Sequence, residues 1–256
     1  MTNDRRVLVH PDNTALFGSV AARFITKTVD LLDDLGTANI VLTGGRAGTG
    51  VMSAINESSA RDSVDWTRVH FWWGDERFVP AGHEDRNDVG ARAALLDHIP
   101  VPAENIHPFP ASDEVADLDE AVAVYTAELA RFAMDGNEVP RFDITFLGVG
   151  PDGHIASLFP DRPEVGVKDV PVVAVRDAPK PPPLRLSLTR PVLNGSDRIW
   201  LVLSGADKAA ALGLGMAGAS FHEVPVAGIK GRKRTVFFVD QDAAAEVPES
   251  LIAPSY

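Results

Sequence analysis

The segment FDITFLGVGPDGHIASLFP, from Phe142 to Pro160, decides the fold of this 256-residue chain. Its first part is a short apolar run around Ile144, which predicts a buried β-strand. A glycine-rich turn follows the run and carries Asp152 and His154. In an open α/β sheet, ligands bind just beyond the carboxyl ends of the strands. The segment therefore places a histidine where it can perform acid–base chemistry on a small molecule. The alternative is an ordinary turn in which His154 only packs or caps.

Strands and helices alternate on both sides of this segment. The predicted strands cover residues 6–10, 39–43, 69–73, 142–148, 172–175, 184–188, 199–204 and 235–239. One predicted helix is capped by Asp12 or Asn13 and ends at Gly36. The other predicted helices cover residues 48–55, 87–98, 112–132 and 206–216. This alternation predicts an α/β fold with a mainly parallel sheet and helices on both faces. The proline-rich run 179–183 between two of these strands is interpreted as a surface connection.

Composition excludes several functional classes. The chain has no cysteine, which rules out disulfides and thiolate chemistry. Its net charge is -12, with 24 basic and 36 acidic residues, whereas a nucleic-acid-binding protein typically shows the opposite balance. The one basic cluster, at 230–234, is interpreted as a solvated turn. No signal peptide and no apolar segment of about 20 residues is evident. We therefore expect a cytoplasmic protein that binds neither nucleic acid nor a membrane.

A second glycine-rich turn follows the predicted strand 39–43. It contains Thr43, Gly44, Gly45 and Arg46, and a helix is predicted just after it. Glycines let the backbone approach a ligand closely, and the unpaired N–H groups at a helix start favour anions. The turn has neither P-loop spacing nor a regular dinucleotide-binding spacing. It predicts phosphate binding, although many glycine-rich turns after strands look similar.

Polar residues also follow the predicted strand 69–73. Asp75 can orient a histidine, and Arg77 can hold an anion in a fork of donors. The alternative is a surface salt bridge between neighbours, which contributes little. Downstream, Asn87 opens a predicted helix and is both a capping residue and a candidate ligand contact.

Lys208 lies at the predicted start of the helix 206–216. The helix dipole disfavours a cation at this end, and a phosphate bound there would relieve the conflict. The alternative is an exposed lysine without a ligand.

Four motifs occur in a recognisable order along the chain. They are TGG at 43–45, WGDER at 73–77, GVGPDGHIASLFP at 148–160 and SGADK at 204–208. On these motifs the chain resembles the 6-phosphogluconolactonase family over nearly its full length. That family shares a superfamily with glucosamine-6-phosphate deaminase.

The resemblance implies a single domain, residues 1–256, with a modified Rossmann-like α/β fold. It implies hydrolysis of 6-phospho-D-glucono-1,5-lactone to 6-phospho-D-gluconate in the oxidative pentose phosphate pathway, without a metal or cofactor. The expected partner is the sugar phosphate lactone alone, and the expected assembly is a monomer or weak homodimer. In this resemblance His154 is the general base that activates water, and Asp75 is its partner. The predicted substrate- and phosphate-binding residues are Thr43, Gly44, Gly45, Arg46, Arg77, Asn87, Asp152, Gly153 and Lys208.

Two sequence features refine the resemblance. Arg46 stands where many relatives have a small hydroxyl residue, so that it either adds a phosphate contact or points away. The segment 156–160 lacks the glutamate that deaminases use for ring opening, which favours the lactonase. The alternatives are a deaminase/isomerase-like enzyme, a non-catalytic sugar-phosphate-binding protein and, less well supported, a dinucleotide-dependent dehydrogenase.

Overall fold

The computed structural model describes residues 4–134 and 136–252, so the two ends of the predicted domain lie outside the described residues. A seven-stranded sheet forms its centre, and every strand pair in that sheet is parallel. The strand order is β1-β10-β9-β6-β2-β3-β5. The strands are β1 (Asp4–His10), β2 (Ala38–Leu42), β3 (Val69–Trp73), β5 (Ile106–His107), β6 (Ile144–Leu147), β9 (Arg198–Leu203) and β10 (Arg234–Asp240). The predicted mainly parallel sheet is thus confirmed.

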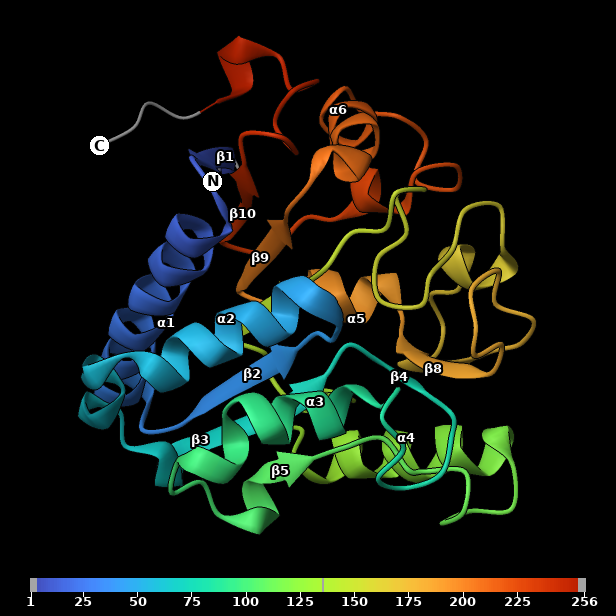
Figure 1. Cartoon of the computed structure of the whole chain (residues 1–256). Helices are drawn as coiled ribbons and strands as arrows, with labels where there is room; N and C mark the ends of the chain where they lie inside the picture. The colour runs from blue at the N-terminus through green and yellow to red at the C-terminus, as the bar shows by residue number, and fades with distance from the viewer. Residues whose placement is uncertain (1–3, 135, 253–256) are drawn as a thin grey trace.

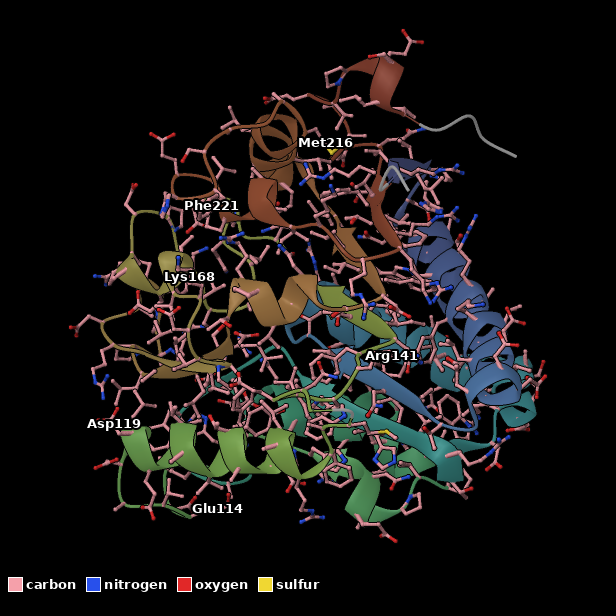
Figure 2. The ribbon with its side chains drawn as sticks, turned by 180° about the vertical axis from the view of Figure 1, so that it is seen from behind. Glu114, Asp119, Arg141, Lys168, Met216 and Phe221 are labelled. Carbon is pink, nitrogen blue, oxygen red and sulfur yellow. The ribbon has the colours of Figure 1, made fainter. Side chains whose placement is uncertain are left out.

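Helices cover both faces of this sheet, as predicted. The helices α2 and α3 lie in front of it in Figure 1, and α4 and α5 lie in front of it in the reverse view of Figure 2. The helices are α1 (Asn13–Leu35), α2 (Gly45–Glu57), α3 (Asn87–Ala94), α4 (Leu118–Arg131), α5 (Arg190–Asn194) and α6 (Ala209–Met216). None of the helices within the described residues combines the length and the apolarity needed to cross a membrane.

The two faces of the sheet are packed by alternate side chains of the strands. Phe146 of β6 meets Phe24 of α1, with ring centroids 5.5 Å apart. Trp72 of β3 points to the other face and meets Tyr125 of α4 edge-on. All four residues of β6 are buried, which fits a strand covered on both sides. The short apolar run that predicted a buried strand here is therefore confirmed.

Helix boundaries follow local capping chemistry. The Asp12 side chain accepts from the Ala15 backbone N–H and starts α1, and Gly36 at φ 81° ends it, both as predicted. Three other predictions misplace a helix start. The helix predicted at 206 begins at Ala209, after a 3-10 turn. The helix predicted at 112 begins at Leu118, because the Asp117 carboxylate caps the Glu120 N–H. The helix predicted at 48 begins at Gly45.

A second, antiparallel sheet packs beside the first. It consists of β4 (Asp75–Arg77), β8 (Arg185–Leu188) and β7 (Val172–Val175), in the order β4-β8-β7. Asp75 pairs with Ser187 across this sheet. The sequence pattern predicts β7 and β8 but not β4, because β4 is short and polar and is formed only by pairing with a segment more than 100 residues later.

The order in which successive strands are added to the large sheet reverses between β2 and β6. From β2 the chain continues to β3 and β5 on one side, and from β6 it continues to β9 and β10 on the other. Such a switch point opens a crevice beyond the carboxyl ends of the two strands, and ligands bind there in doubly wound sheets. The turns 43–46 and 148–154 follow these two strands, so the fold brings the two predicted glycine-rich turns together.

Candidate active site

A cleft of about 480 Å³ lies at the switch point. Thr43 follows β2, and its hydroxyl accepts a hydrogen bond of 3.3 Å from the backbone N–H of Gly148, which follows β6. This bond ties the two strand ends together at the bottom of the cleft. Nine of the eleven predicted site residues line it: Thr43, Gly44, Gly45, Arg46, Asp75, Arg77, Asn87, His154 and Lys208.

The start of α2 forms one wall. Gly44 is the N-cap of this 13-residue helix and provides no side-chain cap for the first N–H groups. Those groups therefore point into the cleft without a protein side chain on the N-cap to satisfy them, and an anion can take that place. Gly45 has φ 74°, a conformation that favours glycine.

Gly44 also permits a close approach of other side chains. A Cβ atom at this position would overlap the side-chain amide of Asn87 and would lie 3.1 Å from Arg77 Nη1. Arg77 in turn donates to Asn87 Oδ1. The backbone of the β2–α2 turn, the Arg77 guanidinium and the Asn87 amide thus form one continuous surface, which only glycine at position 44 allows.

Two further cations reach the cleft from different elements. Arg46 extends toward the end of β9, where its guanidinium lies 3.4 Å from the Ser204 carbonyl oxygen. Lys208 lies in the 3-10 turn before α6 and pairs with Asp207 at 3.0 Å. Arg46 therefore lines the cleft and does not point away from it, while its contact with a phosphate stays a prediction. Lys208 is also a lining residue, although it precedes α6 and does not lie in its first turn.

Glu76 is a buried residue that sequence reasoning missed. Its carboxylate accepts from the backbone N–H groups of Arg77, Asn87 and Asp88, and it lies 3.9 Å from Arg86. Burial raises the pKa of Glu76 to about 7, against the opposing charge of Arg86 and these three donors. Glu76 thereby fixes the start of α3 against β4 and so holds Asn87 and Arg77 together.

His154 is held by the turn 150–154. The Gly150 N–H donates to the His154 carbonyl oxygen at 2.9 Å, and the Gly153 N–H donates to the Gly150 carbonyl oxygen at 2.9 Å. The His154 ring lies 4.6 Å from the Phe159 ring, centroid to centroid. Its Nδ1 atom lies 2.5 Å from Asp152 Oδ1. Burial alone would raise the pKa of Asp152, but this hydrogen bond and the charges of His154 and Lys180 hold it well below its usual range.

The expected pairing of His154 with Asp75 does not form in this structure. Asp75 Oδ2 instead accepts a 2.7 Å hydrogen bond from Ser157 Oγ, and Asp75 also accepts from the Asn87 amide through its backbone oxygen at 2.8 Å. The reason is the pairing of β4 with β8, which holds Asp75 beneath the His154 turn, while Asp152 is only two residues from the histidine. The carboxylate partner of His154 is therefore Asp152.

Asp152 and Gly153 are the two predicted site residues that do not line the cleft. Asp152 contacts the Nδ1 atom of His154 from outside the cleft. Gly153 has φ 83°, and a Cβ there would lie 2.7 Å from Val224 Cγ1. Its carbonyl oxygen accepts from the Val226 N–H at 3.0 Å. Gly153 thus anchors the turn to the segment after α6.

Lys180 and Arg185 also line the cleft, and neither was predicted to do so. Lys180 lies in the proline-rich run, which is a wall of the cleft as well as a surface connection. The run of prolines around a single lysine is the sequence signal that could have pointed to it. Arg185 begins β8 and is buried.

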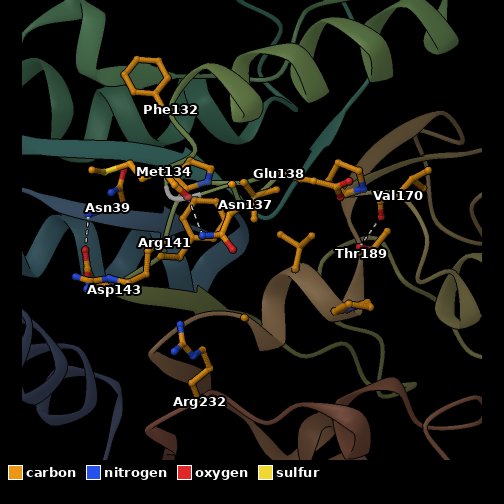
Figure 3. Close-up of a pocket in the computed structure, with 18 of the residues that line it drawn as sticks. Asn39, Phe132, Met134, Asn137, Glu138, Arg141, Asp143, Val170, Thr189 and Arg232 are labelled. Atoms are coloured by element: carbon orange, nitrogen blue, oxygen red, sulfur yellow. Dashed lines mark hydrogen bonds and ion pairs between the residues drawn. The ribbon is translucent and has the colours of Figure 1, made fainter.

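A larger cavity of about 930 Å³ lies at the opposite, amino-terminal ends of the strands (Figure 3). Its main polar groups are already partnered. Asp143 accepts from the Asn39 backbone N–H at 2.9 Å and from Arg141 at 2.6 Å, and Thr189 donates to the Val170 carbonyl oxygen at 3.0 Å. The Asn39–Asp143 contact among them holds the amino-terminal ends of β2 and β6 together. We therefore place the chemistry in the smaller cleft.

Among residues 4–134 and 136–252, no group of three or more His, Asp or Glu side chains is arranged to hold a metal ion. The cleft instead combines His154, which is paired with the Asp152 carboxylate behind it, with five cations, Arg46, Arg77, Lys180, Arg185 and Lys208. Such a set can move a proton and can bind an anion.

Comparison with known proteins identifies the family to which the chain is similar. The family model described as glucosamine-6-phosphate isomerases/6-phosphogluconolactonase matches residues 11–238. The 6-phosphogluconolactonase of Streptomyces coelicolor is 43% identical over 100% of this chain and 99% of its own length. That of Mycobacterium tuberculosis is 41% identical over 94% of this chain and 97% of its own length.

Solved structures show the same fold. The crystal structure of the 6-phosphogluconolactonase from Thermotoga maritima has a TM-score of 0.81 and 26% identity, and the match covers 93% of this chain and 100% of that one. A monomeric glucosamine-6-phosphate deaminase has a TM-score of 0.75 at 19% identity, over 94% of this chain and 99% of that one. Because both structures match well, the fold alone does not separate the two activities.

Proposed function

Since the chain belongs to the glucosamine-6-phosphate isomerase/6-phosphogluconolactonase family, we propose that it hydrolyses 6-phospho-D-glucono-1,5-lactone to 6-phospho-D-gluconate. One observation carries this proposal: His154, backed by the Asp152 carboxylate, and an anion-attracting helix start line the same cleft. The substrate has the matching layout, because its phosphate is on C6 and its reactive ester carbon is C1. The reaction belongs to the oxidative pentose phosphate pathway.

The phosphate end is formed by the start of α2 together with Arg46 and Lys208. Backbone N–H groups at Gly44 and Gly45 face the phosphate, and the helix dipole favours the negative charge. The two cations contribute charge-assisted hydrogen bonds. These contacts hold the lactone far from C1, so their binding energy orients the ester for attack.

The hydrolytic end is formed by His154. With Nδ1–H donated to Asp152, the Nε2 atom carries the lone pair that accepts a proton. His154 removes a proton from water as the water oxygen attacks C1, and the imidazolium then protonates the departing ring oxygen. The proton that leaves water is thus delivered to the new hydroxyl group. Asp152 orients the ring and stabilises the imidazolium, as the acid does in a catalytic triad.

The developing charge on the carbonyl oxygen requires a donor. The N–H groups of Gly150 and Gly153 are already used within the turn. Arg77 remains as a cation in the cleft, and it is fixed by Asn87 and Glu76. We assign Arg77 to this role, in which a preorganised donor stabilises the oxyanion.

Asp75 acts in this proposal as a positioning residue. Its carboxylate holds the Ser157 hydroxyl beneath the His154 turn, and its backbone oxygen holds Asn87. It therefore connects the histidine turn to the Arg77–Asn87 surface without touching the histidine itself.

The test is hydrolysis of freshly generated lactone by wild type and His154→Ala side by side. Product is followed through coupled 6-phosphogluconate dehydrogenase, and spontaneous hydrolysis is subtracted. We expect rapid turnover that collapses in the variant. Absence of acceleration by wild type, with ammonia release from glucosamine 6-phosphate, would replace the lactonase with the deaminase reading.

We also propose a cytoplasmic location and a monomeric or weakly dimeric state. Light scattering on a size-exclusion column tests the second point, with a mass near 27.4 kDa expected at low concentration. A stable mass of a tetramer or larger would contradict it.

A further inference from the structure

The proline-rich run 179–183 places Lys180 next to the Nδ1 atom of His154. Lys180 Nζ lies 3.4 Å from Asp152 Oδ1 and 3.4 Å from His154 Nδ1. Lys180 is 26 residues from His154 in sequence, so that the chain must fold back over the turn to place it there. The Asp152 carboxylate therefore lies between two cationic or proton-bearing groups.

A buried arginine, Arg185, holds the segment that contains Lys180 in place. Arg185 donates to the carbonyl oxygens of Lys180 and Pro181 at 3.1 and 2.9 Å through Nη2, and to that of Pro182 at 3.1 Å through Nε. The prolines have no N–H groups with which to form a regular turn. The guanidinium fork supplies these donors instead, and the Ala178 N–H closes the loop on the Pro183 carbonyl oxygen at 2.9 Å.

The charges around His154 come from four elements. Asp152 and Lys180 contact the ring directly. Arg185 lies on the Phe159 ring, 5.6 Å from its centroid, and that ring also packs against His154. Asp75 lies behind Ser157. Asp152 alone would stabilise an imidazolium strongly and so would slow the return of its proton to the leaving oxygen. Lys180 offsets that effect at close range.

We propose that Lys180 is a positioning residue that fixes the Asp152 carboxylate on His154 Nδ1 and opposes persistent protonation of the imidazole. This inference rests on the proposed function, in which His154 is the base. It gives the proline-rich run a role in catalysis. Arg185 holds the run in place, and the run places the positive charge of Lys180 next to the His154–Asp152 pair.

The test compares Lys180→Met, which removes the charge, with Lys180→Arg, which keeps it. Lys168→Met is the control for loss of a lysine outside the cleft. We measure kcat and KM for the lactone between pH 5 and 8. One unit charge at about 4 Å in water-like surroundings corresponds to roughly 0.7 pH unit. We therefore expect the acidic limb of the kcat/KM profile to move about 0.5–1 unit to higher pH in Lys180→Met only. An unmoved limb, with a raised KM alone, would overturn the proposal.

A second measurement separates this inference from the lactonase assignment. The His154 imidazole is titrated by NMR without substrate, in wild type and in both Lys180 variants. We expect the midpoint to rise in Lys180→Met and to stay near wild type in Lys180→Arg. An unchanged midpoint in a folded Lys180→Met protein overturns the role of Lys180, even if wild type is an active lactonase. If wild type lacks lactonase activity, the function fails while the titration still measures Lys180.

Discussion

Asp152 Oδ1 lies 2.5 Å from His154 Nδ1, within one five-residue turn at the carboxyl end of β6. This relationship determines which ring nitrogen can act as a base. The carboxylate accepts from Nδ1–H and leaves the Nε2 lone pair for the proton of the attacking water. The pKa of Asp152 is held well below its usual range, so that this carboxylate stays charged throughout the pH range of ordinary assays.

Asp152→Asn tests that pairing. An asparagine can donate to Nδ1 and so favours the wrong tautomer, which removes the base without removing the histidine. We expect kcat to fall by about 10²-fold or more, within the range that general base catalysis contributes. Asp169→Asn, an exposed carboxylate outside the cleft, should keep wild-type kcat. If Asp152→Asn keeps kcat within a few-fold of wild type, the pairing has no catalytic role.

Lys208→Met tests the phosphate end. A charge-assisted hydrogen bond contributes about 1.5–3 kcal/mol, which corresponds to roughly a 10- to 100-fold change in affinity. We expect KM to rise by that factor, while kcat falls much less, because the contact is the same in ground state and transition state. Lys230→Met, in the basic turn before β10, is the matched control. A fall in kcat at unchanged KM would place Lys208 at the reacting carbon instead.

Alanine substitutions at two glycines test the close approach of Asn87 to the backbone of the β2–α2 turn. A Cβ at Gly44 overlaps the Asn87 amide, which is buried and bonded to Asp75. Gly44→Ala should therefore displace Asn87 and Arg77 and lower kcat/KM by more than 10-fold. Gly18→Ala is the control, because Gly18 lies in the second turn of α1 and a Cβ there meets nothing within 4 Å. It should stabilise the protein by about 0.5–1 kcal/mol with unchanged activity. Equal activity of the two variants would show that the packing of Asn87 and Arg77 against Gly44 does not matter for catalysis.

A histidine pair that joins β3 and β5, of which His107 is buried and His70 half-buried, predicts a loss of stability at acidic pH. His70 Nδ1 lies 3.1 Å from His107 Nε2, and burial lowers the pKa of both rings, although the Glu128 carboxylate at 2.8 Å opposes the shift at His107. Between these lowered values and about 6.5, the unfolded chain binds more protons than the folded one. The contribution of the pair is therefore complete above about pH 6.5 and is lost as the pH falls.

Chemical unfolding from pH 5 to 8 measures this effect. We expect the free energy of unfolding to fall more steeply toward pH 5 in wild type than in the double variant His70→Gln/His107→Gln. The comparison with the variant is necessary because the raised pKa of Glu76 has the opposite dependence on pH. Parallel curves for the two proteins would show that the histidine pair does not titrate on unfolding.

Much of the fold follows from the sequence because its signals are local. The apolar runs that form β3 and β6, the Asp12 cap and the Gly36 stop lie within the segments that they shape. What the sequence could not show depends on contacts between distant segments. The strand β4 has no apolar pattern and exists only through pairing with β8.

The same distinction explains the site. The residues at the ends of β2 and β6 were predictable, because parallel strands bring their carboxyl ends to one edge. The partner of His154 was mispredicted, since the β4–β8 pairing directs Asp75 to Ser157. Lys180 was missed because its place depends on three carbonyl contacts from Arg185, a residue in another element.

Chemical rescue of His154→Ala tests the central claim most directly. The variant is assayed for lactone hydrolysis at pH 7 with increasing imidazole, and the rate with imidazole but without enzyme is subtracted. If His154 is the general base, kcat falls by about 10²-fold or more and is partly restored, with saturation, as imidazole fills the vacated site. If His154→Ala hydrolyses the lactone at nearly the wild-type rate, or if imidazole restores nothing to a folded variant, His154 is not the base.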